Sequence, residues 1–220
     1  MLLLHGQPGS ARDWDRVIAA LGPGFQPLAI DRPGWDGVTE PRGLADNADA
    51  ALAALDRAGV ETATVVGYSW GGAVAAWLAA AYPQRVSRVV LVAPAANVAS
   101  LLPIDYVQAA PVIGELASAA ALASAAAALR ERRLLTRSRW RSFLAEQRTL
   151  IRELPRLEPI LSRITAPTKI VIGTADRLVP PTSARTLARQ IPTASLVEIE
   201  SRGHLLPWRD PRRLAEIVAG

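Results

Sequence analysis

A serine near the end of the first third of the chain has the surroundings of a nucleophile. Residues 67–72 read Gly-Tyr-Ser-Trp-Gly-Gly, which places Ser69 on a turn flanked by glycines. An apolar run precedes this turn, and a run of small residues suited to a helix follows it. Strand, sharp turn and helix form a nucleophile elbow, which exposes the serine Oγ at the end of a sheet. Glycine suits such a turn because a β-carbon would crowd it.

A serine hydroxyl needs a base that removes its proton, and the chain contains only two histidines. His204 follows the last predicted strand, in a loop that contains glycine. Loops at the carboxyl ends of parallel strands face the same crevice as the nucleophile turn. We therefore predict that His204 is the base. The alternatives are that His204 is a surface histidine, or that the base is His5, which we expect instead to brace its own loop.

An imidazole base needs an acid that fixes its tautomer and stabilises the imidazolium. Asp176 follows the penultimate predicted strand and precedes His204 by 28 residues, a gap that fits one helix and one strand. Adjacent parallel strands would place the loops that carry Asp176 and His204 side by side. We predict that Asp176 is the acid. Asp31 and Asp36 also follow a strand and are the alternatives.

The oxyanion that forms when a serine attacks a carbonyl group requires two backbone N–H donors. The amide of Trp70, directly after the serine, is the first predicted donor. The second is expected from the loop His-Gly-Gln-Pro-Gly after the first strand, where the amide of Gln7 is the candidate.

Short apolar runs alternate with helical patterns over most of the chain. Runs of this kind, separated by helices, indicate an α/β fold with a mostly parallel sheet covered on both faces. Residues 94–165 break the alternation with Ala-rich and Arg-rich helical patterns, so we predict a core of residues 1–93 and 166–220 with a helical cap insertion. The predicted strands are residues 2–4, 27–30, 62–66, 88–92, 169–172 and 196–199, and the predicted core helices are 14–21, 44–58, 71–81, 182–190 and 211–218.

Composition narrows the class of protein. The chain has 220 residues, half of them hydrophobic, which suits one large domain with an insertion. The absence of cysteine excludes disulfides, a thiol nucleophile and thiolate metal sites. Two histidines argue against a zinc or iron site, so we predict neither metal nor cofactor. No secretory signal is visible and the most apolar stretch, residues 116–129, is too short to span a bilayer, so we expect a cytoplasmic protein without a membrane partner.

The net charge of +5 is concentrated in residues 130–163, which contain ten arginines and four glutamates. Nucleic-acid binding is one interpretation of such a cluster. However, these arginines alternate with apolar residues at helical spacing and no nucleic-acid-binding motif accompanies them. We therefore predict solvated helix faces and no nucleic-acid partner. In the preceding Ala-rich segment, the spacing of Leu116, Leu122 and Leu129 predicts an apolar inner face of a lid over Ser69.

The order Ser69, Asp176, His204, with His-Gly-x-Pro-Gly upstream and Gly-x-Ser-x-Gly-Gly at the elbow, resembles the α/β-hydrolase fold superfamily. The resemblance is to its esterase, haloperoxidase-like and proline-iminopeptidase-like branch with a helical cap, and it covers the whole chain except the cap. A serine at the elbow argues against the similar haloalkane dehalogenase and epoxide hydrolase branches, which carry aspartate there.

This resemblance implies a cofactor-independent serine hydrolase that cleaves an ester or related acyl bond through an acyl-enzyme. We expect a small-molecule substrate with an apolar acyl group. The cap would set the specificity for this substrate, but the cap sequence does not identify the substrate. The alternatives are an acyltransferase, a carbon–carbon bond hydrolase or a lyase on the same scaffold, or a non-catalytic ligand-binding member.

The chain departs from the family pattern at its start. Related proteins usually carry two further strands before the His-Gly loop, whereas here Met1 opens the strand of that loop. The sheet would then have six strands instead of eight, with residues 27–30 at its edge. Either this is a natural minimal form of the fold, or the start of the chain has been lost; the sequence is compatible with both. We predict that this edge is paired in a homodimer, covered by a loop such as residues 31–42, or prone to aggregation.

Overall fold

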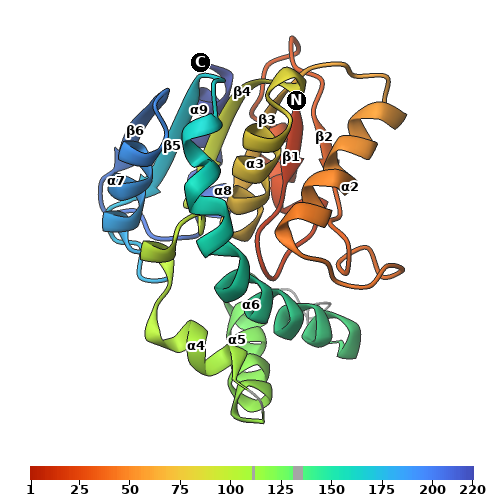
Figure 1. Ribbon diagram of the computed structural model, residues 1–220, viewed down its shortest axis with the longest axis vertical. Helices are drawn as coiled ribbons and strands as arrows, with labels where there is room; N and C mark the ends of the chain where they lie inside the picture. The colour runs from red at the N-terminus through yellow and green to blue at the C-terminus, as the bar shows by residue number, and fades with distance from the viewer. Residues whose placement is uncertain (111, 131–135) are drawn as a thin grey trace.

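The computed structural model describes residues 1–110, 112–130 and 136–220. Within them six strands form one sheet in the order β2-β1-β3-β4-β5-β6, and every neighbouring pair is parallel. The predicted α/β class and the edge position of β2 are confirmed (Figure 1). The strands are β1 (Leu2–Leu4), β2 (Leu28–Ile30), β3 (Ala63–Tyr68), β4 (Val86–Val92), β5 (Thr168–Gly173) and β6 (Ala194–Ile199).

Helices flank this sheet in the alternation that the sequence predicts. In Figure 1, α2 (Leu44–Arg57) and α3 (Trp70–Ala81) lie in front of the sheet and pack on one another. Helix α1 (Asp15–Ile18) packs on α9 (Pro211–Ala219), and α7 (Pro181–Gln190) packs on β5 and β6. A short helix, α8 (Leu206–Arg209), precedes α9.

The predicted helix over residues 14–21 is wrong in extent. A 3-10 turn, η1 (Ala11–Trp14), comes first, and α1 then covers only four residues. The chain begins to turn earlier because the Asp13 carboxylate accepts a hydrogen bond from the backbone N–H of Ser10. The other predicted elements differ from the observed ones by a few residues at their ends.

The described residues between β4 and β5 contain helices and no strand. They form α4 (Pro103–Ala109), α5 (Ile113–Leu129) and α6 (Arg137–Leu157), with short 3-10 segments before and after them. Figure 1 shows α4, α5 and the start of α6 below the sheet, while the end of α6 runs up along the core. The end of α6 contributes Leu150 and Leu154 to the main hydrophobic core, whereas Phe143, near its start, packs in a separate small cluster. Helix α6 therefore contributes side chains to both the main hydrophobic core and this smaller cluster.

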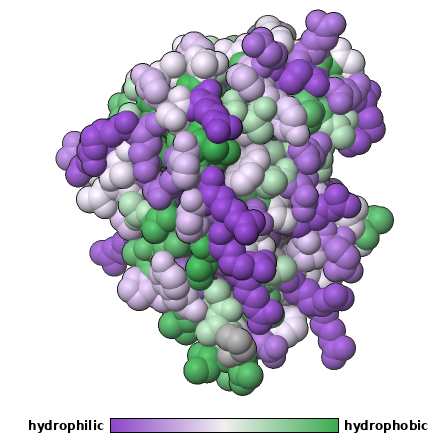
Figure 2. All heavy atoms as spheres, viewed as in Figure 1, coloured by the Kyte–Doolittle hydropathy of each residue, from purple (hydrophilic) through white to green (hydrophobic). Residues whose placement is uncertain are grey.

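Large exposed apolar side chains gather on α4 and α5, where Figure 2 shows hydrophobic colour at the foot of the molecule. Leu116 is among them, with 77% of its surface exposed, so its predicted place on an inner face is wrong. Six residues advance an α-helix by about 240° beyond a full turn, which puts Leu116 away from Leu122. Seven residues bring Leu129 back to the side of Leu122, and these two are buried or half-buried.

Among the described residues, no single helix is long and apolar enough to cross a membrane. Helices α4 and α5 pass this test of length and composition only as a pair, and they are bent by 116° at the break between them.

Candidate active site

Ser69 lies between the end of β3 and the start of α3, on a backbone that few residues adopt. Its φ of 52° is positive, although it is not glycine. The neighbouring glycines permit this turn, because a β-carbon on Gly71 would lie 2.4 Å from the carbonyl oxygen of His5. A β-carbon on Gly67 would lie 2.2 Å from the carbonyl oxygen of Gly71. Strained residues of this kind cluster at functional sites.

The three predicted side chains lie together. His204 Nε2 is 3.0 Å from Ser69 Oγ, and His204 Nδ1 is 2.7 Å from Asp176 Oδ2. Asp176 comes from the turn after β5 and His204 from the loop after β6, and these strands pair directly. The other Asp176 oxygen accepts hydrogen bonds from the backbone N–H groups of Leu178 and Val179, both at 2.9 Å. The carboxylate is thus fixed at both oxygens.

The alternative residues have other partners. Asp31 accepts a hydrogen bond from the N–H of Ala11, and Asp36 accepts from its own loop at Val38 and Thr39. His5 is fully buried, and its Nε2 accepts a hydrogen bond from the N–H of Arg32. Burial, with the Arg32 charge as the second cause, holds the pKa of His5 well below its usual value. A neutral His5 that braces its loop is what this environment favours.

This arrangement can carry out proton transfer from a serine. A carboxylate at Nδ1 keeps the proton on that nitrogen and leaves Nε2 free to accept the proton of Ser69 Oγ. The tautomer is inferred from these partners. Tyr68, beside the serine, is not a competing base, because burial raises the pKa of its phenol well above 10.

The residues whose amides are the predicted oxyanion donors border the same cavity as Ser69. Trp70 is the first residue of α3, where N–H groups have no partner within their own helix. Gln7 lies in the loop after β1, and its side-chain Nε2 donates a hydrogen bond of 2.7 Å to the carbonyl of Phe143 in α6. The peptide bond from Gln7 to Pro8 is cis.

A cavity of about 370 Å³ opens at Ser69 between the core and α4, α5 and α6. Its wall on the α5 side consists of small or apolar side chains, namely Ala121, Ser124, Ala125, Ala128 and Leu129. Phe143 and Leu150 of α6 and Leu178, Val179, Leu205 and Trp208 from the core complete much of the remaining wall.

Charged groups are scarce in this cavity. Among the described residues that line it, Asp105 and His204 are the titratable side chains apart from Tyr68, and none is arginine or lysine. Asp105 Oδ1 accepts a hydrogen bond from Gln147 Nε2, which also donates to Gln108 Oε1. Helices α4 and α6 therefore contribute a hydrogen-bonded polar group of three side chains to the wall.

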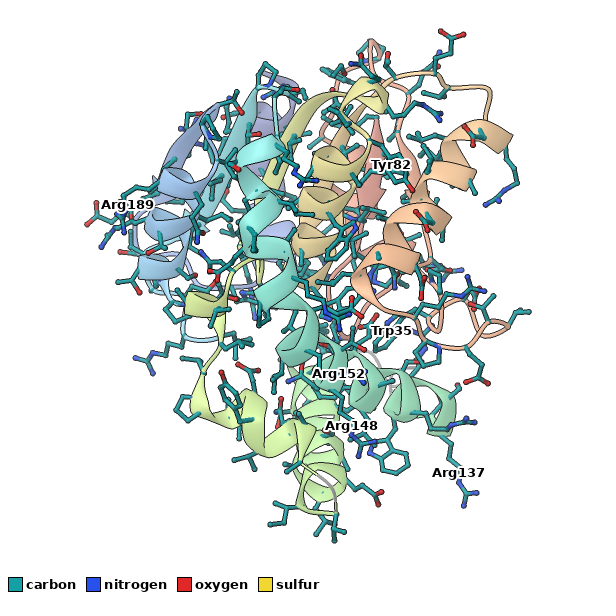
Figure 3. The ribbon with its side chains drawn as sticks, in the orientation of Figure 1. Trp35, Tyr82, Arg137, Arg148, Arg152 and Arg189 are labelled. Atoms are coloured by element: carbon teal, nitrogen blue, oxygen red, sulfur yellow. The ribbon has the colours of Figure 1, made fainter. Side chains whose placement is uncertain are left out.

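The described arginines of residues 130–163 are exposed, apart from a half-buried Arg139. Figure 3 shows Arg137, Arg148 and Arg152 along α6, with Arg137 extended away from the molecule. Arg139 donates hydrogen bonds to the backbone carbonyls of Gly9 and Trp35. Arg132 and Arg133 lie outside the described residues.

Sequence reasoning missed a buried ion pair beside the site. Arg32, after β2, contacts Glu146 of α6, and the two side chains are 1% and 0% exposed. The signal that could have found it is helical spacing, because Glu146 shares a face with the apolar Phe143 and Leu150. A carboxylate on such a face must have a partner.

The part of the chain that the structure describes holds no group of three or more His, Asp or Glu side chains placed to bind a metal ion.

Residues 1–217 match the model of the alpha/beta hydrolase family. A curated relative from Burkholderia cepacia, named 2-hydroxy-6-oxo-6-phenylhexa-2,4-dienoate hydrolase, is 28% identical over 94% of this chain and 82% of its own length. A relative from Comamonas testosteroni, named 2-hydroxy-6-oxononadienedioate/2-hydroxy-6-oxononatrienedioate hydrolase, is 26% identical over the same shares.

Solved structures of similar fold include a meta-cleavage product hydrolase, CumD, with a TM-score of 0.76 and 25% identity. The match covers 99% of this chain and 88% of that one. A thermophilic esterase from Thermogutta terrifontis has a TM-score of 0.80 at 22% identity, over 99% of this chain and 87% of the esterase, which shows likeness of fold alone.

Proposed function

Because this chain belongs to the alpha/beta hydrolase family, we propose that it is a cofactor-independent serine hydrolase of neutral esters with a medium-length apolar acyl group. In this proposal Ser69 is the nucleophile, His204 the base and Asp176 the acid that orients it. The amides of Gln7 and Trp70 hold the oxyanion, and the segment 94–165 is a lid that sets specificity.

The reaction has two halves. Ser69 Oγ attacks the ester carbonyl while His204 Nε2 takes its proton, and the tetrahedral oxyanion forms in reach of the two amides. When the C–O bond of the ester breaks, His204 gives that proton to the leaving alcohol. Water then attacks the acyl-enzyme with His204 again as base, which releases the acid and restores Ser69.

The observation that carries the proposal is the Ser69–His204–Asp176 array at the floor of an apolar cavity without a described cationic side chain. Apolar walls with few polar groups are typical of small-molecule sites. A carboxylate inside this cavity would have no described arginine or lysine to pair with and would lie near Asp105. Burying an unpaired charge is costly, so a neutral substrate fits better.

A second candidate is hydrolysis of a carbon–carbon bond. The two curated relatives described above are named for 2-hydroxy-6-oxo compounds, a dienoate in one case and a dienedioate and a trienedioate in the other. These compounds have no ester bond, so their hydrolysis breaks a carbon–carbon bond. The same three side chains could serve that reaction. The named compounds carry a carboxylate, which the described cavity does not match.

The test compares kcat/KM for p-nitrophenyl hexanoate, for its analogue with a terminal carboxylate, and for a 2-hydroxy-6-oxo-dienoate, over a salt series. We expect the neutral ester to be preferred and its rate to be insensitive to salt. Ser69→Ala and His204→Ala should each abolish turnover and leave the fold intact, and a fluorophosphonate probe should label Ser69. A strong, salt-sensitive preference for a carboxylate-bearing compound would contradict the proposal and support an anionic substrate. Trapping of the acyl group by added alcohols would indicate acyl transfer.

A further inference from the structure

All three nitrogens of the Arg32 guanidinium donate hydrogen bonds within the core. Its Nε donates to the carbonyl oxygen of His5 at 2.9 Å, and one terminal nitrogen donates to the carbonyl oxygen of Gly6 at 2.9 Å. Its Cζ lies over the ring of Trp70, 4.3 Å from the centroid. One arginine therefore contacts both the loop that carries Gln7 and the residue directly after Ser69.

Glu146 supplies the opposite charge from α6. Its carboxylate accepts hydrogen bonds from both terminal nitrogens of Arg32. The backbone carbonyl of Glu146 accepts a longer hydrogen bond, of 3.4 Å, from the indole Nε1 of Trp70. One turn earlier in the same helix, the Phe143 carbonyl accepts the hydrogen bond from the Gln7 side chain.

These contacts join the two proposed oxyanion donors to a single helical turn. The side chains of Gln7 and Trp70 each donate a hydrogen bond to a backbone carbonyl of α6. Arg32, which is paired with Glu146 of α6, also contacts the Trp70 ring and the carbonyl of Gly6 next to Gln7. Catalytic hydrogen-bond donors must be held in place before the reaction, because a displacement of 1 Å can reduce the rate 100-fold. A buried ion pair is not needed for stability alone, since apolar residues of similar size are often as stable.

From this geometry we propose that Arg32 and Glu146 are positioning residues that hold the Gln7 and Trp70 amides toward the oxyanion, so that α6 takes part in the chemical step. This inference rests on the proposed function. It goes beyond a lid that selects substrates, because it assigns α6 a role that is independent of the acyl group bound.

The experiment uses the full chain and compares Glu146→Gln with a matched control, Glu153→Gln. Glu153 is another carboxylate of α6 that contacts the core, where it accepts a hydrogen bond of 2.6 Å from the N–H of Leu44, away from the oxyanion loop. The measurements are kcat and KM for p-nitrophenyl hexanoate, the Ki of an alkyl boronic acid, and Tm. The tetrahedral boronate places an oxygen where the oxyanion forms, so its Ki reports on those amides.

For Glu146→Gln we expect kcat to fall roughly 10- to 100-fold with KM changed little, which is less than the loss of a whole oxyanion donor. The Ki of the boronic acid should rise by a similar factor. Glu153→Gln should lower Tm while kcat and the boronate Ki stay within about twofold of wild type. If Glu146→Gln lowers Tm but leaves kcat and the boronate Ki at their wild-type values, the proposal is wrong.

A double variant, Arg32→Met with Glu146→Leu, separates positioning from folding. It removes both charges together and leaves no buried ion unpaired, although the carbonyl oxygens of His5 and Gly6 lose their Arg32 donor. Its Tm should therefore lie closer to that of the wild type than the Tm of Glu146→Gln does. We still expect the low kcat and the weak boronate binding. Wild-type values of both in this variant would overturn the inference. If the wild type fails to cleave the ester and Ser69 escapes the fluorophosphonate, the proposed function itself is wrong, which is a separate outcome.

Discussion

The ring of Tyr68 lies against that of His204, with centroids 5.1 Å apart and planes inclined by 40°. Trp208 packs against the same Tyr68 ring in an edge geometry, at a centroid distance of 5.5 Å. The imidazole is thus held by packing as well as by its hydrogen bond to Asp176. Removal of the Asp176 charge should therefore leave His204 in place, so a loss of rate can be assigned to its tautomer.

We expect Asp176→Asn to lower kcat for an activated ester by on the order of 10⁴, the loss measured for the corresponding change in a serine protease. An amide at this position would donate a hydrogen bond to His204 Nδ1, so the imidazole proton would be on Nε2. His204 Nε2 could then not accept the proton of Ser69. Steady-state kinetics with circular dichroism as the check of folding would measure this. A near-wild-type rate would direct attention to Asp31 or Asp36.

Cavity size should control acyl length. Ala125 lines the cavity, so Ala125→Phe should fill part of it and lower kcat/KM for the hexanoate ester by roughly tenfold or more. The acetate ester, which is shorter, should lose much less. Ala123 lies on the same helix and is exposed, away from the cavity wall, so Ala123→Phe is the matched control. Equal losses for both esters would mean that α5 does not bound the acyl site.

Folding stability should fall as the pH drops below about 6.5. His5 has a pKa held well below its usual 6.5 in the folded state, chiefly by burial. The unfolded chain therefore takes up a proton that the folded chain refuses, which costs up to about 1.4 kcal/mol per pH unit. Urea unfolding of the wild type and of His5→Asn, from pH 7.5 to about 5.5, would measure this, and the slope should flatten in the variant.

The measurement stops at about pH 5.5 because Glu146 changes the free energy of unfolding in the opposite direction to His5 at lower pH. Burial raises the pKa of Glu146, with Arg32 opposing the change. Folded Glu146 then binds its proton at a higher pH than the unfolded residue, which favours the folded state on further acidification. A wild-type free energy of unfolding that stays constant from pH 7.5 to about 5.5 would contradict the role given to His5.

The elbow should not tolerate a side chain at its second glycine. In Gly71→Ala the new β-carbon would meet the backbone oxygens of His5 and Leu4 at 2.4 and 2.5 Å. Since backbone must move, we expect a loss of roughly 1–3 kcal/mol or more in the free energy of unfolding, and lower activity. Gly22 has nothing within 4 Å of its β-carbon position, so Gly22→Ala should be neutral or slightly stabilising. Denaturant unfolding of the two variants would measure both free energies of unfolding, and equal values would contradict this prediction.

The parts of this structure that depend on local pattern could be predicted from the sequence. The six strands, their parallel pairing and the convergence of Ser69, Asp176 and His204 follow from apolar runs and chain order. Helical spacing marks Glu146 as a carboxylate on a buried face, but its pairing with Arg32 could not be predicted, because the two residues are 114 positions apart and meet only through the packing of α6 on the core. The homodimer at the β2 edge and the cytoplasmic location stay predictions.

The Arg32–Glu146 pair also limits how freely segments can be exchanged between relatives. A chimaera that replaces residues 94–165 with the corresponding insertion of another hydrolase keeps Arg32 but discards Glu146. An insertion without an acid at that place would leave a buried guanidinium unpaired, which destabilises a protein by about 3–5 kcal/mol. In evolution and in engineering alike, the core arginine and the inserted glutamate are therefore expected to be inherited or lost as one unit.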